Sequence, residues 1–193
     1  MKVLAITGRM ATGKSTILKQ LKFLGVNSFS SDEIVNNIYK KDFEFISTIM
    51  NLYPQVIEQG KINKNELSNL AFNNKEILKK LEKLIYPILD RKRRNIIKTS
   101  FLNSIRLVVF EIPLLFEKKI DNKFCLVITT TCNKKLQKQR YLKRKNSTLK
   151  KFNFINNQFV EDNKRFKDSN FVINTGNGKH HSLLLLKKII NKI

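Results

Sequence analysis

The chain has 193 residues, and its 38 lysines and arginines against 15 aspartates and glutamates give a formal charge of +23. This length fits one domain with a full apolar core, and two cysteines are too few for a disulfide framework, which favours a reducing cytoplasmic location. The charge would suit polyanionic partners. The basic residues are spread along the whole chain and no aromatic residues interleave with arginines, so we expect no nucleic-acid partner.

Apolar runs bounded by polar turns predict strands at 2–7, 106–112, 124–129 and 171–173, with a weaker one at 26–30. Helical patterns separate them, at 14–24, 32–50, 64–72, 75–100, 133–145 and 182–192. This alternation predicts an α/β fold, with an open parallel sheet of about five strands and helices on both faces.

We expect a single domain over 1–193, with an inserted helical lobe at roughly 55–103 and a polar segment at roughly 143–168 that could serve as a lid. The apolar runs at 2–7 and 183–186 are too short for a signal sequence or a membrane span, so no membrane association is expected. Cys125, inside the run FCLVIT, is expected to be a buried small apolar residue. No pattern indicates an oligomeric state.

A phosphate-binding loop follows the first predicted strand. Gly8 to Ser15 satisfy G-x-x-x-x-G-K-[ST], the pattern of P-loop NTPases, directly before a helix-forming segment. Gly8 and Gly13 allow close backbone approach to phosphate, Lys14 reaches the β- and γ-phosphates, and Ser15 can ligate Mg²⁺. ATP with Mg²⁺ is therefore the expected co-substrate, and Arg9 to Ala11 fill positions where the pattern makes no demand.

Asp32 follows the weak strand at 26–30, at the edge of the sheet where ligands of α/β proteins bind. It could accept the proton of an acceptor hydroxyl or orient the metal. It could equally be part of a helix N-cap, since Ser30, Ser31 and Asp32 all suit a helix start.

Arg140 and Arg144 are four residues apart and are expected on one face of a helix. Two guanidinium groups there could hold a polyphosphate and stabilise the transferring phosphoryl group. The lysine-rich surroundings also allow a merely solvated basic face. His180 and His181 have no metal-ligating neighbours in sequence and are expected in an exposed loop.

From KVLAITG through PLLFE to VINTG, the whole chain resembles the dephospho-coenzyme A kinases. The resemblance implies transfer of the γ-phosphate of ATP to the 3′-hydroxyl of dephospho-coenzyme A, the last step of coenzyme A synthesis. It implies catalytic roles for Asp32, Lys14 and Arg140 and a metal role for Ser15. It implies nucleotide contacts for Gly8, Ala11, Thr12, Gly13, Lys14, Ser15, Thr16, Arg144 and Asn174.

The chain departs from the family pattern at several positions. Arg9 and Ala11 replace glycines of the loop, and Ser30 replaces the first acid of D-A-D. The other departures, in the helical lobe and the lid, are Lys64, Tyr86 and Phe154. The alternatives are another small-molecule or nucleotide kinase on the same core, a nucleic-acid-binding ATPase and a non-catalytic relative that binds ATP.

Overall fold

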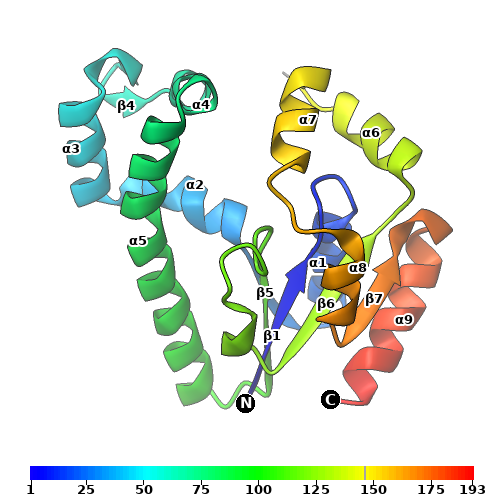
Figure 1. Cartoon of the computed structure of the whole chain (residues 1–193). Helices are drawn as coiled ribbons and strands as arrows, with labels where there is room; N and C mark the ends of the chain where they lie inside the picture. Colours follow the sequence, from blue (N-terminus) through cyan, green and yellow to red (C-terminus); the bar gives the residue numbers. More distant parts are fainter. Residues whose placement is uncertain (146) are drawn as a thin grey trace. The chain divides into compact units, whose positions relative to one another are not determined.

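The computed structural model describes residues 1–145 and 147–193 (Figure 1). The chain forms two compact units, and each has its own apolar core. The first unit combines Met1–Ser30 with Ser100–Ile193, and the second is the segment Ser31–Thr99 between them.

A five-stranded parallel sheet forms the centre of the first unit, with the strand order β2-β5-β1-β6-β7. The strands are β1 (Lys2–Thr7), β2 (Asn27–Ser30), β5 (Leu107–Glu111), β6 (Leu126–Thr131) and β7 (Phe171–Asn174). Because all pairs are parallel, the carboxyl ends of the strands lie at one edge. The loop after the central strand β1 therefore lies at the middle of that edge, where α/β proteins bind ligands.

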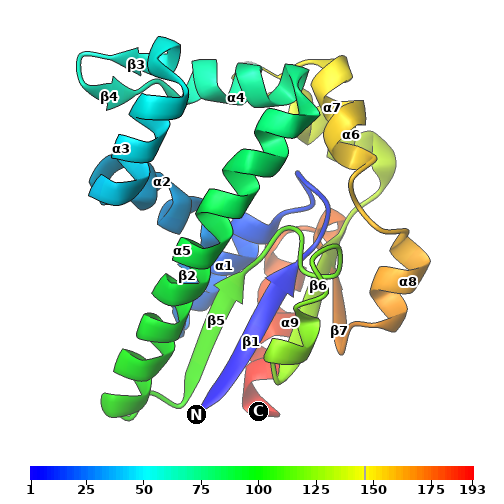
Figure 2. The ribbon, with the colours of Figure 1, turned by 60° about the vertical axis from the view of Figure 1, so that its left-hand side comes forward.

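Helices α1 (Lys14–Phe23) and α9 (Lys179–Asn191) pack against each other and against the sheet. Ile17 and Leu21 of α1 and Leu186 of α9 join the buried residues of the strands in one apolar cluster. Helix α8 (Asp162–Lys167) lies on the opposite side of β7 from α9 (Figures 1 and 2). The predicted α/β class with five parallel strands is confirmed.

The remaining elements of the first unit connect the strands. They are the 3-10 turns η2 (Asp121–Lys123) and η3 (Thr175–Asn177) and the helices α6 (Lys134–Leu142) and α7 (Leu149–Asn156). Helices α7 and α8 fall within the predicted lid range 143–168, and Asn146 of that range lies outside the described residues.

The second unit is mainly helical. It contains α2 (Ser31–Lys41), α3 (Phe43–Leu52), η1 (Pro54–Val56), a short hairpin of β3 (Ile57–Glu58) and β4 (Lys61–Ile62), α4 (Lys64–Asn73) and α5 (Lys75–Leu102), which ends three residues beyond the unit. Its core includes Ile38, Phe45, Ile49 and Leu67, all at most 2% exposed. The predicted lobe of about 55–103 overlaps this unit, which begins earlier, at Ser31.

The predicted single helix over 32–50 is wrong, because the chain turns at Asp42. Helix α2 ends at Lys41 and α3 begins at Phe43. The Asp42 backbone is extended, and its carboxylate accepts a hydrogen bond of 3.2 Å from the backbone N–H of Phe45. An aspartate that caps a new helix in this way competes with continuation of the old one.

Two further expectations are corrected. Cys125 is exposed, because β6 begins one residue later and Cys125 lies at its amino-terminal end. His180 and His181 are exposed as expected, but they lie in the first turn of α9 instead of a loop. Within residues 1–145 and 147–193, no helix has the length and apolar composition needed to cross a bilayer.

We expect Asp42→Ala to lower the free energy of unfolding by about 1 kcal/mol, because the first turn of α3 loses its cap. Asp42→Asn is the matched control, since asparagine caps as well as aspartate and should change stability by only a few tenths of a kcal/mol, roughly. Urea unfolding followed by circular dichroism measures both. An alanine variant as stable as the asparagine variant would contradict the capping role.

Candidate active site

The loop between β1 and α1 keeps its path because two of its residues have no side chain. Gly8 has a φ of 143°, and a Cβ there would lie 2.5 Å from the carbonyl oxygen and from the hydroxyl of Thr130. Gly13 has a φ of 98°, and its Cβ would lie 2.8 Å from the Thr175 hydroxyl. Any other residue at these positions would displace the loop from β6 or from η3.

Ala11 replaces the third glycine of the family pattern. The expectation that the pattern leaves this position unconstrained is wrong, because the backbone there is left-handed. Ala11 has a φ of 59°, the left-handed region in which a Cβ costs roughly 1 kcal/mol or more relative to glycine. Its methyl group is 5% exposed and belongs to an apolar cluster with Met10, Tyr141 and Phe152. That burial offsets part of the backbone cost.

Lys14, the first residue of α1, lies across the loop. Its side chain is buried, and its ammonium donates to the carbonyl oxygens of Gly8 at 2.8 Å and Arg9 at 2.9 Å. The next residue, Ser15, is exposed in the first turn, and Thr16 is half-buried. Lys14 and Ser15 therefore stand at the amino-terminal, positive end of α1, where a phosphate group is favoured.

Threonine hydroxyls brace the loop from the neighbouring strands. The Thr12 hydroxyl donates to the Arg9 carbonyl at 2.8 Å and shares a hydrogen bond of 2.8 Å with the Thr130 hydroxyl. The Thr175 hydroxyl donates to the Thr12 carbonyl at 2.7 Å. Sequence reasoning missed Thr130 and Thr175. Their place at the carboxyl ends of two predicted strands was the signal that could have found them.

Arg140 reaches this loop through Thr175. Its guanidinium donates to the Thr175 hydroxyl at 2.9 Å and to the Thr175 carbonyl at 3.2 Å, and the side chain is half-buried. Helix α6 therefore places one arginine beside the phosphate loop. Burial raises the pKa of the nearby Cys132 thiol, and the positive charge of Arg140 opposes that shift.

The expectation that Arg140 and Arg144 share one helix face is wrong. Helix α6 ends at Leu142, and Arg144 lies beyond it and is exposed. The Ser147 hydroxyl lies 3.0 Å from the carbonyl of Leu142, the last helical residue, and 2.7 Å from the Arg144 carbonyl, so it can bond either of them. The chain turns there instead of continuing the helix.

Gln137 is a second residue of α6 that sequence reasoning missed. It is 3% exposed, and its amide donates to the Met10 carbonyl of the phosphate loop at 2.9 Å. Nothing in a lysine-rich helical segment marks one glutamine as buried. Asn174, by contrast, is exposed and accepts a hydrogen bond from the Gly176 N–H as the N-cap of η3.

A buried acid lies beside the phosphate loop at the end of β5. Glu111 is 3% exposed and pairs in register with Ile6, two residues before Gly8. On its other side it pairs with Ser30, whose hydroxyl donates to the Glu111 carboxylate at 2.9 Å. Ser30, which replaces an acid of the family pattern, thus supports a neighbouring carboxylate.

Asp32 is the second residue of the second unit, two residues after Ser30. It lies in the first turn of α2 and is exposed. The helix begins at Ser31, so Asp32 is inside the helix and not at its N-cap position. A carboxylate in the first turn also interacts favourably with the helix dipole.

Lys64 and Tyr86, two of the departures from the family pattern, have partners within the second unit. The Lys64 ammonium lies 2.6 Å from the side-chain oxygen of Asn36 and 5.4 Å from the centre of the Tyr39 ring. Burial, and then the charge of Lys40, lower its pKa. The Tyr86 hydroxyl donates to Glu82 at 3.1 Å.

Glu117, in the PLLFE segment, has a structural role. It accepts hydrogen bonds of 2.9 Å from the guanidinium of Arg165, which is 1% exposed, and from the N–H of Val160. Burial lowers the pKa of Arg165, and the charge of Glu117 opposes that shift. Over the part of the chain that the structure describes, no three His, Cys, Asp or Glu residues gather as a metal site.

Comparison with known proteins identifies the family. Residues 2–180 match the family described as dephospho-CoA kinase. The dephospho-CoA kinase of Bartonella quintana is 38% identical over 91% of this chain and 90% of its own length. That of Bartonella henselae is 35% identical over 98% and 99%.

The fold is shared with a solved structure. The TT1252 protein of Thermus thermophilus superposes with a TM-score of 0.80 over 100% of this chain and 97% of its own, at 23% identity. With a matching profile over nearly the whole sequence and relatives above 30% identity, the chain belongs to the dephospho-CoA kinase family.

Proposed function

We propose that the chain transfers the γ-phosphoryl group of ATP to the 3′-hydroxyl of dephospho-coenzyme A, giving coenzyme A and ADP. The observation that carries the proposal is family membership over residues 2–180 combined with an intact phosphate loop. The loop indicates the site of the phosphoryl donor, and family membership indicates that dephospho-coenzyme A is the acceptor.

The loop amides and Lys14 would hold the triphosphate. In the structure the Lys14 ammonium is bonded to two carbonyl oxygens of the loop, so it is already held beside the loop. Its positive charge can stabilise the negative charge that shifts toward the β-phosphate as the γ-phosphoryl group is transferred. Thr12, Gly13, Ser15 and Thr16 would contribute backbone N–H groups, and Ala11 would shape the turn.

Mg²⁺ fits the residues at the start of α1. The exposed Ser15 hydroxyl and the buried Glu111 carboxylate, which ends the strand beside β1, would hold the ion. When bound, the ion neutralises charge on the β- and γ-phosphates. Hydroxyl and carboxylate oxygens are the hard donors that this ion prefers.

Asp32 is the proposed general base. Its exposed carboxylate, in the first turn of α2, can accept the proton of the 3′-hydroxyl as the oxygen attacks. The attacking oxygen then forms its bond to the γ-phosphorus while the bond to the β,γ-bridging oxygen breaks, which leaves ADP. The N-cap alternative loses support, because α2 begins before Asp32.

Arg140 is the proposed cation beside the transferring group. Its two bonds to Thr175 hold the guanidinium at the edge of the loop, where a planar fork can bond two phosphate oxygens. Arg144, exposed beyond the end of α6, is proposed to contact the nucleotide from the lid segment 143–168. Asn174 is proposed at the adenine, beside η3.

The net charge of +23 suits two polyanionic substrates, because it speeds their diffusional encounter with the protein. We propose a cytoplasmic enzyme whose partner is dephospho-coenzyme A and not nucleic acid. Polynucleotide-stimulated ATP hydrolysis with a steep salt dependence would instead indicate a nucleic-acid-dependent ATPase.

An acceptor panel tests the substrate. ADP release with dephospho-coenzyme A should far exceed that with shikimate, nucleosides or nucleoside monophosphates. Lys14→Ala should lower the rate about 100-fold or more, because it removes the charge that stabilises the transferring group. A coupled assay measures each rate. A panel in which another acceptor is preferred would reassign the substrate.

Asp32→Asn should lower kcat about 100-fold or more, because the amide cannot accept the proton. ATP affinity should stay within about twofold, roughly 0.4 kcal/mol. Glu33→Gln is the matched control, since Glu33 is the next acid in the same turn and is also exposed. Near-full turnover by Asp32→Asn, or an equal loss in Glu33→Gln, would contradict the assignment.

A further inference from the structure

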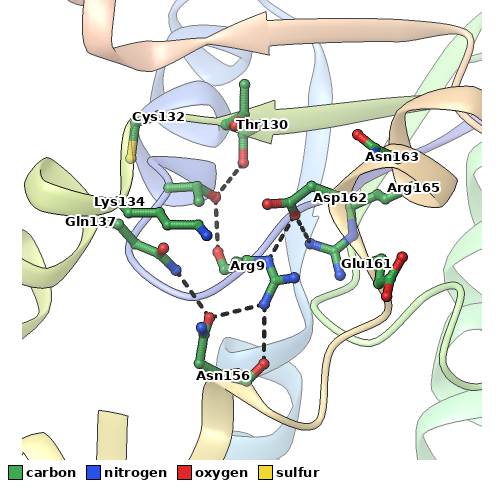
Figure 3. Close-up of a pocket in the computed structure, with 12 residues that line it drawn as sticks. Arg9, Thr130, Cys132, Lys134, Gln137, Asn156, Glu161, Asp162, Asn163 and Arg165 are labelled. Carbon is green, nitrogen blue, oxygen red and sulfur yellow. Dashed lines mark hydrogen bonds and ion pairs between the residues drawn. The ribbon is translucent and has the colours of Figure 1, made fainter. Parts of the chain in front are cut away.

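The side chain of Arg9 leaves the phosphate loop and enters the segment between α7 and α8 (Figure 3). We call residues 156–162 the connector. Arg9 Nε donates to a carboxylate oxygen of Asp162 at 2.7 Å. Its Nη1 donates to both the backbone and the side-chain oxygens of Asn156 at 3.1 Å, and its Nη2 donates to the Val160 carbonyl at 3.1 Å.

All three nitrogens of the guanidinium group are therefore engaged by one short segment. The side chain is 17% exposed, and its central carbon lies 5.9 Å from the centre of the Phe159 ring. An isolated surface ion pair contributes little to stability. A half-buried guanidinium with four directed bonds is a different case, because its planar geometry fixes the position of every acceptor.

The backbone of Arg9 is bonded in turn to the catalytic part of the loop. Its carbonyl oxygen accepts from the Lys14 ammonium at 2.9 Å and from the Thr12 hydroxyl at 2.8 Å. Residue 9 thus joins the connector, through its side chain, to Lys14, through its carbonyl. A displacement of one end acts on the other through a single residue.

Other hydrogen bonds also hold the connector in place. Val160 and Arg165 both bond Glu117, and Asn156 also lies 3.4 Å from the buried amide of Gln137, which bonds the Met10 carbonyl. Arg9, Asp162 and Arg165 line a polar cavity of about 430 Å³ beside the loop (Figure 3). Through its bonds to the connector, Arg9 links residues that line this cavity to the phosphate loop.

We propose that Arg9 is a positioning residue, which fixes the conformation of the phosphate loop by binding it to the connector. Removal of the guanidinium frees both segments, and the nucleotide must then order them on binding, which lowers its affinity. This rests on the proposed function only for the identity of the nucleotide. The coupling itself is a property of the loop and the connector.

Three variants test the proposal. Arg9→Ala removes all four bonds, Asp162→Asn removes only the charged partner, and Arg106→Ala is the control that loses the same charge at an exposed arginine away from the loop. Hydrogen exchange is measured without nucleotide on residues 8–16 and 156–162. Exchange in both segments should accelerate in Arg9→Ala, to a smaller extent in Asp162→Asn, and stay unchanged in Arg106→Ala.

Calorimetric binding of ADP and of a non-hydrolysable ATP analogue is the second readout, at a temperature where every variant is folded. Arg9→Ala should bind both nucleotides about tenfold more weakly, or about 1.4 kcal/mol, and bind dephospho-coenzyme A with unchanged affinity. A purely structural residue would lower the melting temperature and leave nucleotide affinity within about twofold.

Unchanged exchange in residues 8–16 of Arg9→Ala would overturn the proposal, and so would unchanged nucleotide affinity. The test is independent of the acceptor: if the unmodified protein phosphorylates a different substrate, the function is reassigned and the exchange result still decides the role of Arg9.

Discussion

The Thr130 and Thr175 side chains occupy space that β-carbons at Gly8 and Gly13 would need. The rest of the site depends on this close contact between the loop and the ends of the strands. The same two hydroxyls bond the loop through Thr12. The loop therefore takes its shape from the carboxyl edge of the sheet. A phosphate cradle needs backbone N–H groups held in advance at fixed positions, because ordering them on binding would cost affinity.

Two arginines add contacts around the loop. Arg140 of α6 bonds Thr175, which itself bonds the loop, and Arg9 bonds the loop to the connector before α8. Both guanidinium groups use their planar geometry to bond carbonyl and hydroxyl or carboxylate oxygens together. Of the two residues that replace glycines of the family pattern, Arg9 bonds the connector and the methyl group of Ala11 packs in an apolar cluster. These substitutions are better understood as an altered support of the loop than as its decay.

Much of the fold could be predicted because its signals are local. Short apolar runs predicted the strands, and the pattern at Gly8 to Ser15 located the loop at the right place on the sheet. The errors arose where one residue decides a boundary. Asp42 starts a new helix, α6 ends at Leu142, before Arg144, and β6 begins just after Cys125.

Contacts between residues distant in sequence could not be predicted. Gln137 bonds Met10, Arg9 bonds Asp162, and Ser30 bonds Glu111. No spacing pattern in the sequence links the two members of any of these pairs. The acceptor had a different source. The phosphate loop indicates only a nucleotide, whereas membership of the dephospho-CoA kinase family identifies the second substrate.

Phosphorus NMR of the complete reaction tests the central claim most directly. With ATP, Mg²⁺ and dephospho-coenzyme A, one new phosphomonoester signal, assigned to the 3′-position, should grow in step with ADP. Inorganic phosphate growing in step with ADP without a new ester, or an ester at another position, would contradict it.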